Sequence, residues 1–219
     1  MNPLTVTEAV RERRSVRAFL DTPVDDATVA ELLELAARAP SGGNVQPWRI
    51  YVITAATMPR FLDFLSGREL EAPAYDIYPP KLWEPYRTNR FALGEAMYET
   101  LGIGRDDTEG RLGQFARNHR FFDAPVGVFC FVDRRMGPPQ WSDLGMFLQT
   151  FMLLATERGL ATCPQEAWAM WSQAVAEFIE APDEEMLFCG VALGYADPDA
   201  PVNHLVSERM PLDEWARFL

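Results

Sequence analysis

Residues 36–49 have the sequence Ala36-Ala37-Arg38-Ala39-Pro40-Ser41-Gly42-Gly43-Asn44-Val45-Gln46-Pro47-Trp48-Arg49. This stretch joins a predicted helix to a predicted strand, and its middle is rich in small and polar residues. Gly42 and Gly43 allow the backbone to adopt positive φ and to approach a bound molecule closely. Ser41, Asn44 and Gln46 offer hydroxyl and amide groups that can bind a heterocycle. The alternative is an ordinary helix C-cap followed by a turn into a strand, as in most glycine-rich junctions.

A second informative stretch is the arginine-rich segment Arg13-Arg14-Ser15-Val16-Arg17. Arg13 and Arg17 are four residues apart, so one helical turn would place them on the same side, with the hydroxyl of Ser15 between them. Guanidinium groups bind phosphate oxygens through paired, charge-assisted hydrogen bonds. The segment therefore indicates a phosphate site, and the alternative is the solvated end of an amphipathic helix.

The overall composition limits the class of protein. The 219 residues are 48% hydrophobic and carry a net charge of -12, with a sequence pI near 4.6. A chain of this length can bury a sizeable core, and no repeat or linker divides it, so we expect one domain over residues 1–219. The negative charge argues against nucleic-acid binding, because phosphate backbones require a positive surface. Residues 1–12 lack the apolar segment of a signal peptide and no apolar run could span a bilayer, so we expect a cytoplasmic protein without a membrane partner.

Conventional catalytic and metal-binding motifs are absent from the sequence. Cys130, Cys163 and Cys189 lie in apolar segments without a CxxC pair, so we expect buried thiols rather than metal ligands or disulfides. His119 and His204 are too isolated for a histidine-rich metal site, and no metal is expected. We find no dinucleotide-binding fingerprint, no P-loop, no nucleophile elbow and no HExxH. An enzyme with so few acid–base and nucleophilic groups could take its chemistry from a cofactor.

Hydrophobic periodicity and turn residues predict the order of helices and strands. Thr5 and Glu8 form a capping-box pattern that starts a helix running to about Arg14, and Asp25 or Asp26 can cap the next helix. Further helices are predicted at 58–65, 88–101, 108–118, 141–158 and 172–179, and strands at 48–54, 126–132, 160–165 and 186–193. The helix at 141–158 has few polar residues, so we expect it to be buried on most sides.

The middle of the chain, residues 66–118, contains many prolines and aromatic residues but no motif. We interpret it as a long excursion from the core. Two interpretations stay open. It could be a surface elaboration with a small apolar cluster of its own, or a helical lid whose aromatic residues stack on a flat substrate.

Four stretches, in this order along the chain, resemble the FMN-dependent nitroreductase family, and the similarity looks closest to the branch acting on nitrobenzoate-like and nitroaromatic substrates. They are residues 13–17, 36–49, 159–168 and 207–212. The resemblance covers residues 5–54 and about 117–215. It implies an α+β fold with a mostly antiparallel central sheet surrounded by helices, in an intertwined homodimer whose two sites lie at the subunit interface.

The resemblance assigns a phosphate clamp to residues near both ends of the chain. Arg13, Ser15 and Arg17 match positions that hold the FMN phosphate and ribityl chain, and Arg14 occupies the adjoining motif position. Arg209 matches the C-terminal phosphate-binding arginine of the family. Some relatives carry a basic residue two positions earlier, where this chain has a serine, and that difference could weaken the clamp.

The resemblance assigns the flavin ring to other segments. A backbone N–H within Pro164-Gln165-Glu166-Ala167 is the implied partner of flavin N5, and the alternative is a strand end with a charged residue facing water. Many relatives have glycine where this chain has Ala167. Arg120 matches a basic residue near the ring. The residues expected to reach the flavin from the partner subunit are Pro40, Ser41, Gly42, Asn44 and Gln46.

The function implied by the resemblance is an FMN-dependent oxidoreductase. It would use NADH or NADPH to reduce nitroaromatic or related flat electrophilic acceptors by ping-pong hydride transfer. Tightly bound FMN would carry the chemistry, with no catalytic side chain expected. Two alternatives stay open: a flavoenzyme of the same fold for reductive dehalogenation, ene reduction or flavin destruction, and a non-enzymatic flavin-binding or storage protein.

Overall fold

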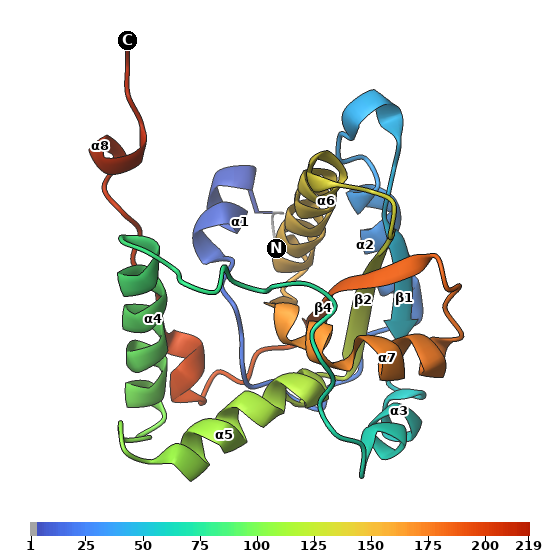
Figure 1. The fold of residues 1–219 in the computed structure, drawn as a ribbon, viewed down its shortest axis with the longest axis horizontal. Helices are drawn as coiled ribbons and strands as arrows, with labels where there is room; N and C mark the ends of the chain where they lie inside the picture. Colours follow the sequence, from blue (N-terminus) through green and yellow to red (C-terminus); the bar gives the residue numbers. More distant parts are fainter. Residues whose placement is uncertain (1–3) are drawn as a thin grey trace.

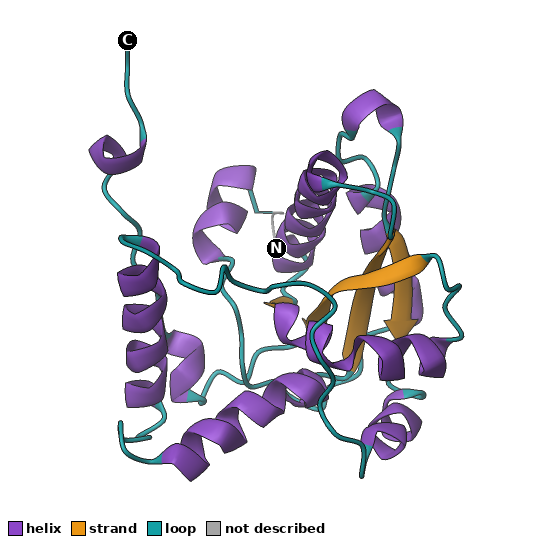
Figure 2. Ribbon diagram, viewed as in Figure 1, coloured by secondary structure: helices purple, strands orange, loops and turns teal. Residues whose placement is uncertain are grey.

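A computed structural model describes residues 4–219 and contains a four-stranded sheet with helices on both faces (Figures 1 and 2). Every predicted helix and strand is found, with ends that differ by at most three residues. The α-helices are α1 (Val6–Glu12), α2 (Asp26–Ala36), α3 (Met58–Leu65), α4 (Tyr86–Thr100), α5 (Thr108–Ala116), α6 (Pro138–Glu157), α7 (Ser172–Ile179) and α8 (Leu212–Trp215). The strands are β1 (Arg49–Ile53), β2 (Val126–Asp133), β3 (Ala161–Gln165) and β4 (Glu185–Gly194). The 3-10 helices are η1 (Gly42–Asn44), η2 (Arg117–Asp123), η3 (Glu166–Trp171) and η4 (Pro201–His204).

The strands are ordered β1-β2-β4-β3, and every neighbouring pair is antiparallel. This confirms the predicted α+β class and its antiparallel sheet. One face of the sheet packs against α2 and α6, and the other against α3, α7 and the two short helices η2 and η3. Because both faces are covered, the central strand β2 is apolar along nearly its whole length.

Alternation along β2 divides its side chains between the two cores. Val128 and Cys130 point towards α2 and α6, whereas Phe129 and Phe131 point towards Phe61 of α3. The ring centroids of Phe61 and Phe129 are 5.6 Å apart. The predicted buried strand is thus confirmed, and each of its faces has its own hydrophobic cluster.

A β-bulge interrupts the pairing of β2 with β4. Cys130 is opposite Cys189 and Phe131 is opposite Leu187, so Phe188 is an extra residue in β4. The carbonyl of Phe188 accepts a hydrogen bond from the hydroxyl of Tyr75, which lies far away in sequence. The bulge therefore provides an attachment point for the excursion that begins at residue 66.

The predicted N-terminal cap is found on α1 but not on α2. Thr5 and Glu8 form the predicted capping box on α1, with the amide of Glu8 donating to Thr5 Oγ1 at 3.3 Å. Asp25 is the N-cap residue of α2, but its side chain makes no capping hydrogen bond. The expected side-chain cap on α2 is therefore wrong.

Helix α6 is buried on one side only within the chain. Ser142, Gly145, Met146 and Gln149 are exposed, and their spacing of three, one and three residues defines one helical stripe. The expectation of burial on most sides is wrong for the single chain, because α2, α1 and the sheet cover only the opposite face. Within residues 4–219, no helix has the length and apolar character that crossing a bilayer requires.

Candidate active site

The arginine-rich segment is extended rather than helical. Helix α1 ends at Glu12, and Ser15 forms an isolated parallel bridge with Thr162 of β3. The amide of Val16 donates to the carbonyl of Thr162 at 3.0 Å. The predicted helical turn is therefore wrong, because pairing with the edge of β3 holds this backbone extended.

The extended conformation still places Arg13 and Arg17 on the same side of the chain, as their spacing predicted. Alternate residues of an extended segment point to the same side, so Arg13, Ser15 and Arg17 share one side. All three are partly buried, whereas Val16, on the other side, is fully buried in the protein.

The charges of Arg13 and Arg17 act on Cys163 of β3, and the charge of Arg209 acts on Arg13. Burial and the positive charge of Arg209 lower the pKa of Arg13. Burial raises the pKa of the Cys163 thiol to about 11, and the charges of Arg17 and Arg13 oppose that rise. Within residues 4–219, Arg13, Arg17 and Arg209 form no salt bridge. A cluster of like charges without a carboxylate is suited to an anion such as a phosphate.

Asn203 of η4 fixes this segment in place, and sequence analysis missed it. Its side-chain oxygen accepts from the amide of Arg17 at 2.9 Å, and its amide nitrogen donates to the carbonyls of Ala18 and Asp197 at 2.8 and 2.9 Å. The Asn203 carbonyl accepts from Arg14 Nη1 at 3.4 Å. No local motif marks this residue, because its partners are almost 200 positions away in the sequence.

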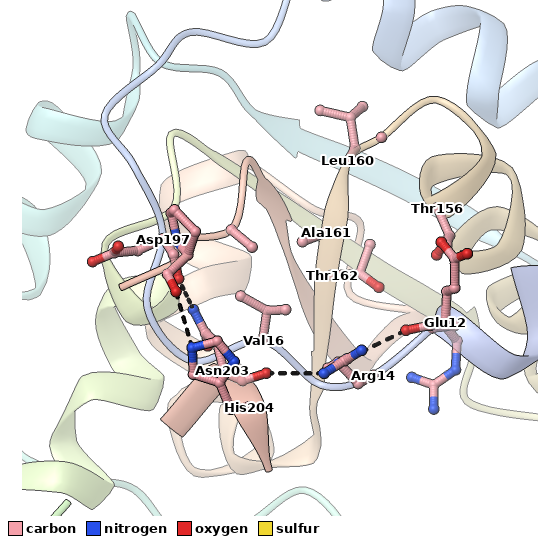
Figure 3. Close-up of a pocket in the computed structure, with 14 residues that line it drawn as sticks. Glu12, Arg14, Val16, Thr156, Leu160, Ala161, Thr162, Asp197, Asn203 and His204 are labelled. Carbon is pink, nitrogen blue, oxygen red and sulfur yellow. Dashed lines mark hydrogen bonds between the residues drawn. The ribbon is translucent and has the colours of Figure 1, made fainter. Parts of the chain in front are cut away.

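A cavity of about 430 Å³ lies beside the arginine cluster, between the end of α1, β3 and η4 (Figure 3). Arg13 and Arg14 line it, together with Thr162 and Asn203. In Figure 3 the guanidinium of Arg14 lies between Glu12 and Asn203 and bonds the backbone carbonyl of each. Arg14 thus bonds carbonyls of α1 and η4, whereas Arg17 and Arg209 bond carbonyls of residues close to them in sequence.

Residues 164–166, at the end of β3 and directly after it, alternate between exposed and buried. Pro164 and Glu166 are exposed, whereas Gln165 between them is 2% exposed. Gln165 Nε2 donates to the carbonyl of Asn118 at 2.7 Å and lies 3.3 Å from Asn118 Oδ1. Desolvation by the surrounding protein raises the pKa of Glu166. Glu166 therefore lies at the surface, while the side chain of Gln165 anchors the end of β3 from inside.

The glycine-rich loop has a defined conformation of its own. Gly43, Asn44 and Gln46 have φ values of 57°, 59° and 50°, which only glycine adopts without strain. The amide of Gly42 donates to both carboxylate oxygens of the buried Asp143 in α6, at 3.3 Å each. Ser41 Oγ accepts from the Gln46 amide at 3.0 Å. Pro40, Gly42, Asn44 and Gln46 are exposed and Ser41 is partly buried, so the loop presents its polar groups outwards.

One chain does not bring this loop to the arginine cluster. The loop bonds Asp143 near the start of α6, whereas Thr156, which lines the cavity beside Arg13, lies near the end of α6. The two residues are 13 positions apart, which corresponds to about 20 Å along a helix.

Arg120 stands apart from the other predicted site residues. It lies in η2, is exposed, and forms a salt bridge of 3.0 Å with Asp123. Within the described part of the chain, no hydrogen bond or salt bridge links Arg120 to the arginine cluster.

The excursion divides into a fixed stem and a projecting part. The Glu71 carboxylate accepts from the amides of Gln173 and Ala174 at the start of α7, at 2.7 and 2.8 Å. The amide of Ala74 donates to the carbonyl of Ala169 at 3.1 Å. Beyond Tyr75 the aromatic residues Tyr78, Trp83, Tyr86 and Phe91 are exposed, and α4 buries none of its residues. Figure 1 shows α4 at the periphery, away from the sheet.

Comparison with known proteins identifies the family. The family model described as "Nitroreductase family" matches residues 10–195. The chain is 37% identical to nitrobenzene nitroreductase of Ectopseudomonas oleovorans, over 98% of this chain and 96% of that one. It is 39% identical to 4-nitrobenzoate reductase of Pseudomonas putida, over 92% and 88% of the two chains. The crystal structure of the FMN- and NADPH-dependent nitroreductase NfnB from Sphigopyxis sp. strain HMH has a TM-score of 0.95, 49% identity and 99% coverage of each chain. The protein therefore belongs to the nitroreductase family.

Proposed function

We propose that the protein is an FMN-dependent oxidoreductase that uses NADPH or NADH to reduce nitroaromatic compounds. The observation that carries this proposal is the cluster of Arg13, Arg17 and Arg209, which has no carboxylate partner within residues 4–219. The relatives support the same reaction, because two of them are named for the reduction of nitrobenzene and 4-nitrobenzoate.

The residues of this chain fit a flavin mononucleotide. Arg13, Arg17 and Arg209 would hold its phosphate, and Ser15 lies on the same side of the extended segment. When bound, FMN supplies the two-electron carrier for hydride transfer. The exposed backbone between Gln165 and Ala167 would present N–H donors to the ring, where they stabilise the charge that reduction creates.

The homodimer is a further part of the proposal. The exposed stripe on α6 and the exposed Val6 and Val10 on α1 support it. The glycine-rich loop and the cavity beside Arg13 contact opposite ends of α6, which supports it too. A second copy would cover these apolar side chains. Pro40, Ser41, Gly42, Asn44 and Gln46 would then reach the flavin of the partner subunit, and each C2 dimer would contain two sites.

Residues 66–118 are proposed as a lid within a single domain of residues 1–219. The fixed stem and the exposed aromatic residues support this role, because the stem holds in place a segment whose aromatic side chains are exposed. Trp83, which is 59% exposed, would contact the acceptor. Trp83→Ala should raise the acceptor KM and leave the FMN content unchanged; loss of FMN with unchanged acceptor kinetics would contradict the lid.

A direct test begins with the colour of the purified protein. It should be yellow, and heating should release FMN rather than FAD on chromatography. Oxidation of NADPH should then depend on nitrobenzene or 4-nitrobenzoate, with the hydroxylamine or nitroso product identified. A protein that cannot be loaded with FMN would overturn the proposal. A yellow protein without acceptor-dependent oxidation would point to flavin storage.

We also propose a cytoplasmic location. Cys130, Cys163 and Cys189 are free thiols in the structure, as expected from the sequence, and unpaired cysteines are typical of reducing compartments.

A further inference from the structure

A strained turn lies directly before β2. Phe121, Phe122 and Asp123 have φ values of 51°, 53° and 67°, so three consecutive residues other than glycine adopt the left-handed conformation. This conformation is unfavourable for residues with a Cβ atom, and it persists only where the surrounding structure enforces it. Such strain is concentrated at functional sites, which makes the residues that this turn positions candidates for a functional role.

Close packing and salt bridges enforce the turn. Phe121 and Phe122 are fully buried, and the ring centroid of Phe121 is 4.6 Å from that of Trp168. A Cβ atom at Gly127 would lie 2.3 Å from the Phe121 ring, so the strand itself leaves room for this ring only because residue 127 is glycine. The carboxylate of Asp123 pairs with Arg117 at 3.1 Å and with Arg120 at 3.0 Å.

The two residues that precede Arg120 contact the segment after β3. The Asn118 carbonyl accepts from Gln165 Nε2 at 2.7 Å. The His119 ring packs edge-on against Trp168 and Trp171, with centroid distances of 5.6 and 5.7 Å. The imidazole also has a hydrogen-bond contact with the Ala167 backbone, which raises the pKa of His119 against the larger, opposite effect of burial. Gln165 and Ala167 are therefore both held from the same side.

We propose that Gln165 and His119 are positioning residues, which fix the Gln165–Ala167 backbone so that its N–H groups meet the flavin ring. The inference rests on the proposed function, because it assigns that backbone to the flavin. The side chains themselves point into the protein and do not touch the cofactor. Their effect is transmitted through the main chain between them, and the strained turn of η2 holds their contacts in place.

Three variants of the FMN-loaded protein test the proposal. Gln165→Met keeps the length of the side chain but removes the donor to Asn118. His119→Phe keeps the ring between Trp168 and Trp171 but removes the donor to Ala167. His119→Asn loses the ring, yet its amide nitrogen lies close to the position of Nδ1 and can restore that hydrogen bond.

The expected results separate positioning from packing. In Gln165→Met and His119→Phe, the rate of flavin reduction by NADPH should fall roughly tenfold, the scale of a small misplacement of reacting groups. The flavin midpoint potential should shift, amide hydrogen exchange of the Gln165–Ala167 segment should accelerate, and the acceptor KM should change less than about twofold. His119→Asn should recover most of the rate and the potential. The matched control Gln173→Met, at an exposed glutamine of α7, should behave as the unaltered protein.

Clear outcomes would overturn the proposal. It fails if Gln165→Met and His119→Phe retain the normal potential, exchange and reduction rate. It also fails if His119→Phe is active and His119→Asn is not, because ring packing would then be the whole contribution. If Gln165→Met does not fold, the flavin reduction rates of His119→Phe and His119→Asn still decide whether the proposal holds. An unaltered protein that binds no FMN would instead refute the proposed function, and this inference with it.

Discussion

At the residue scale, the arginine cluster holds like charges close together, so its electrostatic energy depends on whether an anion is bound. Arg13 and Arg209 repel one another, and that repulsion is relieved when an anion binds between them. Backbone pairing with β3 and the hydrogen bond from the Arg17 amide to Asn203 hold the segment that carries Arg13 and Arg17, so the fold offsets part of the cost of bringing these charges together.

Removal of single arginines should weaken FMN binding selectively. Arg17→Ala and Arg209→Ala should each reduce the binding free energy by about 1.5–3 kcal/mol, the range for charge-assisted hydrogen bonds. Riboflavin, which has no phosphate, should bind the variants and the unaltered protein nearly alike, as measured by fluorescence titration. Arg11→Ala, which removes an equal charge from an exposed position on α1, is the matched control. An equal loss for riboflavin would indicate damage to the fold.

His119 should make the stability of the protein depend on pH. Burial lowers the pKa of His119 from its ordinary value of 6.5 to about 4, because the charged imidazolium is poorly solvated between the tryptophans. The unfolded chain therefore binds a proton at pH 5 that the folded chain does not. The free energy of unfolding should fall as pH decreases from about 6.5 to 4, by at most about 3 kcal/mol.

The measurement is urea unfolding of the unaltered protein and of His119→Phe at several pH values. Subtracting one curve from the other removes the effects of carboxylates that both proteins share. The difference should be constant above pH 7 and should shrink below pH 6. A difference that does not vary between pH 4 and 7 would show that His119 is not a buried neutral imidazole.

At the scale of elements, the start of α7 is one of the points that attach the excursion to the core. The Glu71 carboxylate accepts from two free amides of α7 and lies at the positive end of that helix. It thereby acts as a capping residue supplied by a distant segment. The same carboxylate also ties the stem of the proposed lid to the helix that covers one face of the sheet.

Glu71→Ala should lower the free energy of unfolding by about 1–2 kcal/mol, the usual effect of losing a helix cap. Thermal unfolding of the FMN-free protein provides the measurement. Glu69→Ala removes the same charge from an exposed site two residues away and should have little effect. Equal effects of the two substitutions would indicate that net charge, rather than the cap, is responsible.

For the whole molecule, the decisive question is whether each site is built from two chains. Arg17→Ala and Asn44→Ala should each impair activity. In a refolded mixture, about half of the dimers should be mixed, and one of the two sites in each mixed dimer should lack both substitutions. Activity should therefore recover to about a quarter of the unaltered value. If Arg17 and Asn44 served the same site from one chain, a mixture shown to contain mixed dimers would be no more active than the average of its parts.

Much of the fold could be predicted because local chemistry and tertiary structure agree. The continuous apolar run of β2, the capping box of Thr5 and Glu8, and the helical spacing in α6 each predict the element that is found. The antiparallel character of the sheet came from the family resemblance. The helical turn at Arg13–Arg17 was wrong because no local signal reveals that β3 has an edge free to pair with this segment.

The sequence by itself determined which groups are available: the arginines for an anion, the polar glycine-rich loop, and the apolar segments that form the buried strands. Only the tertiary structure decided which of them meet. Pairing with β3 placed Arg13, Ser15 and Arg17 on one side, and Asn203 held them there from almost 200 residues away. The support of Gln165 by Asn118 likewise depends on long-range packing around a strained turn. Local propensity cannot specify such contacts, because their energy exists only once distant segments are already in place.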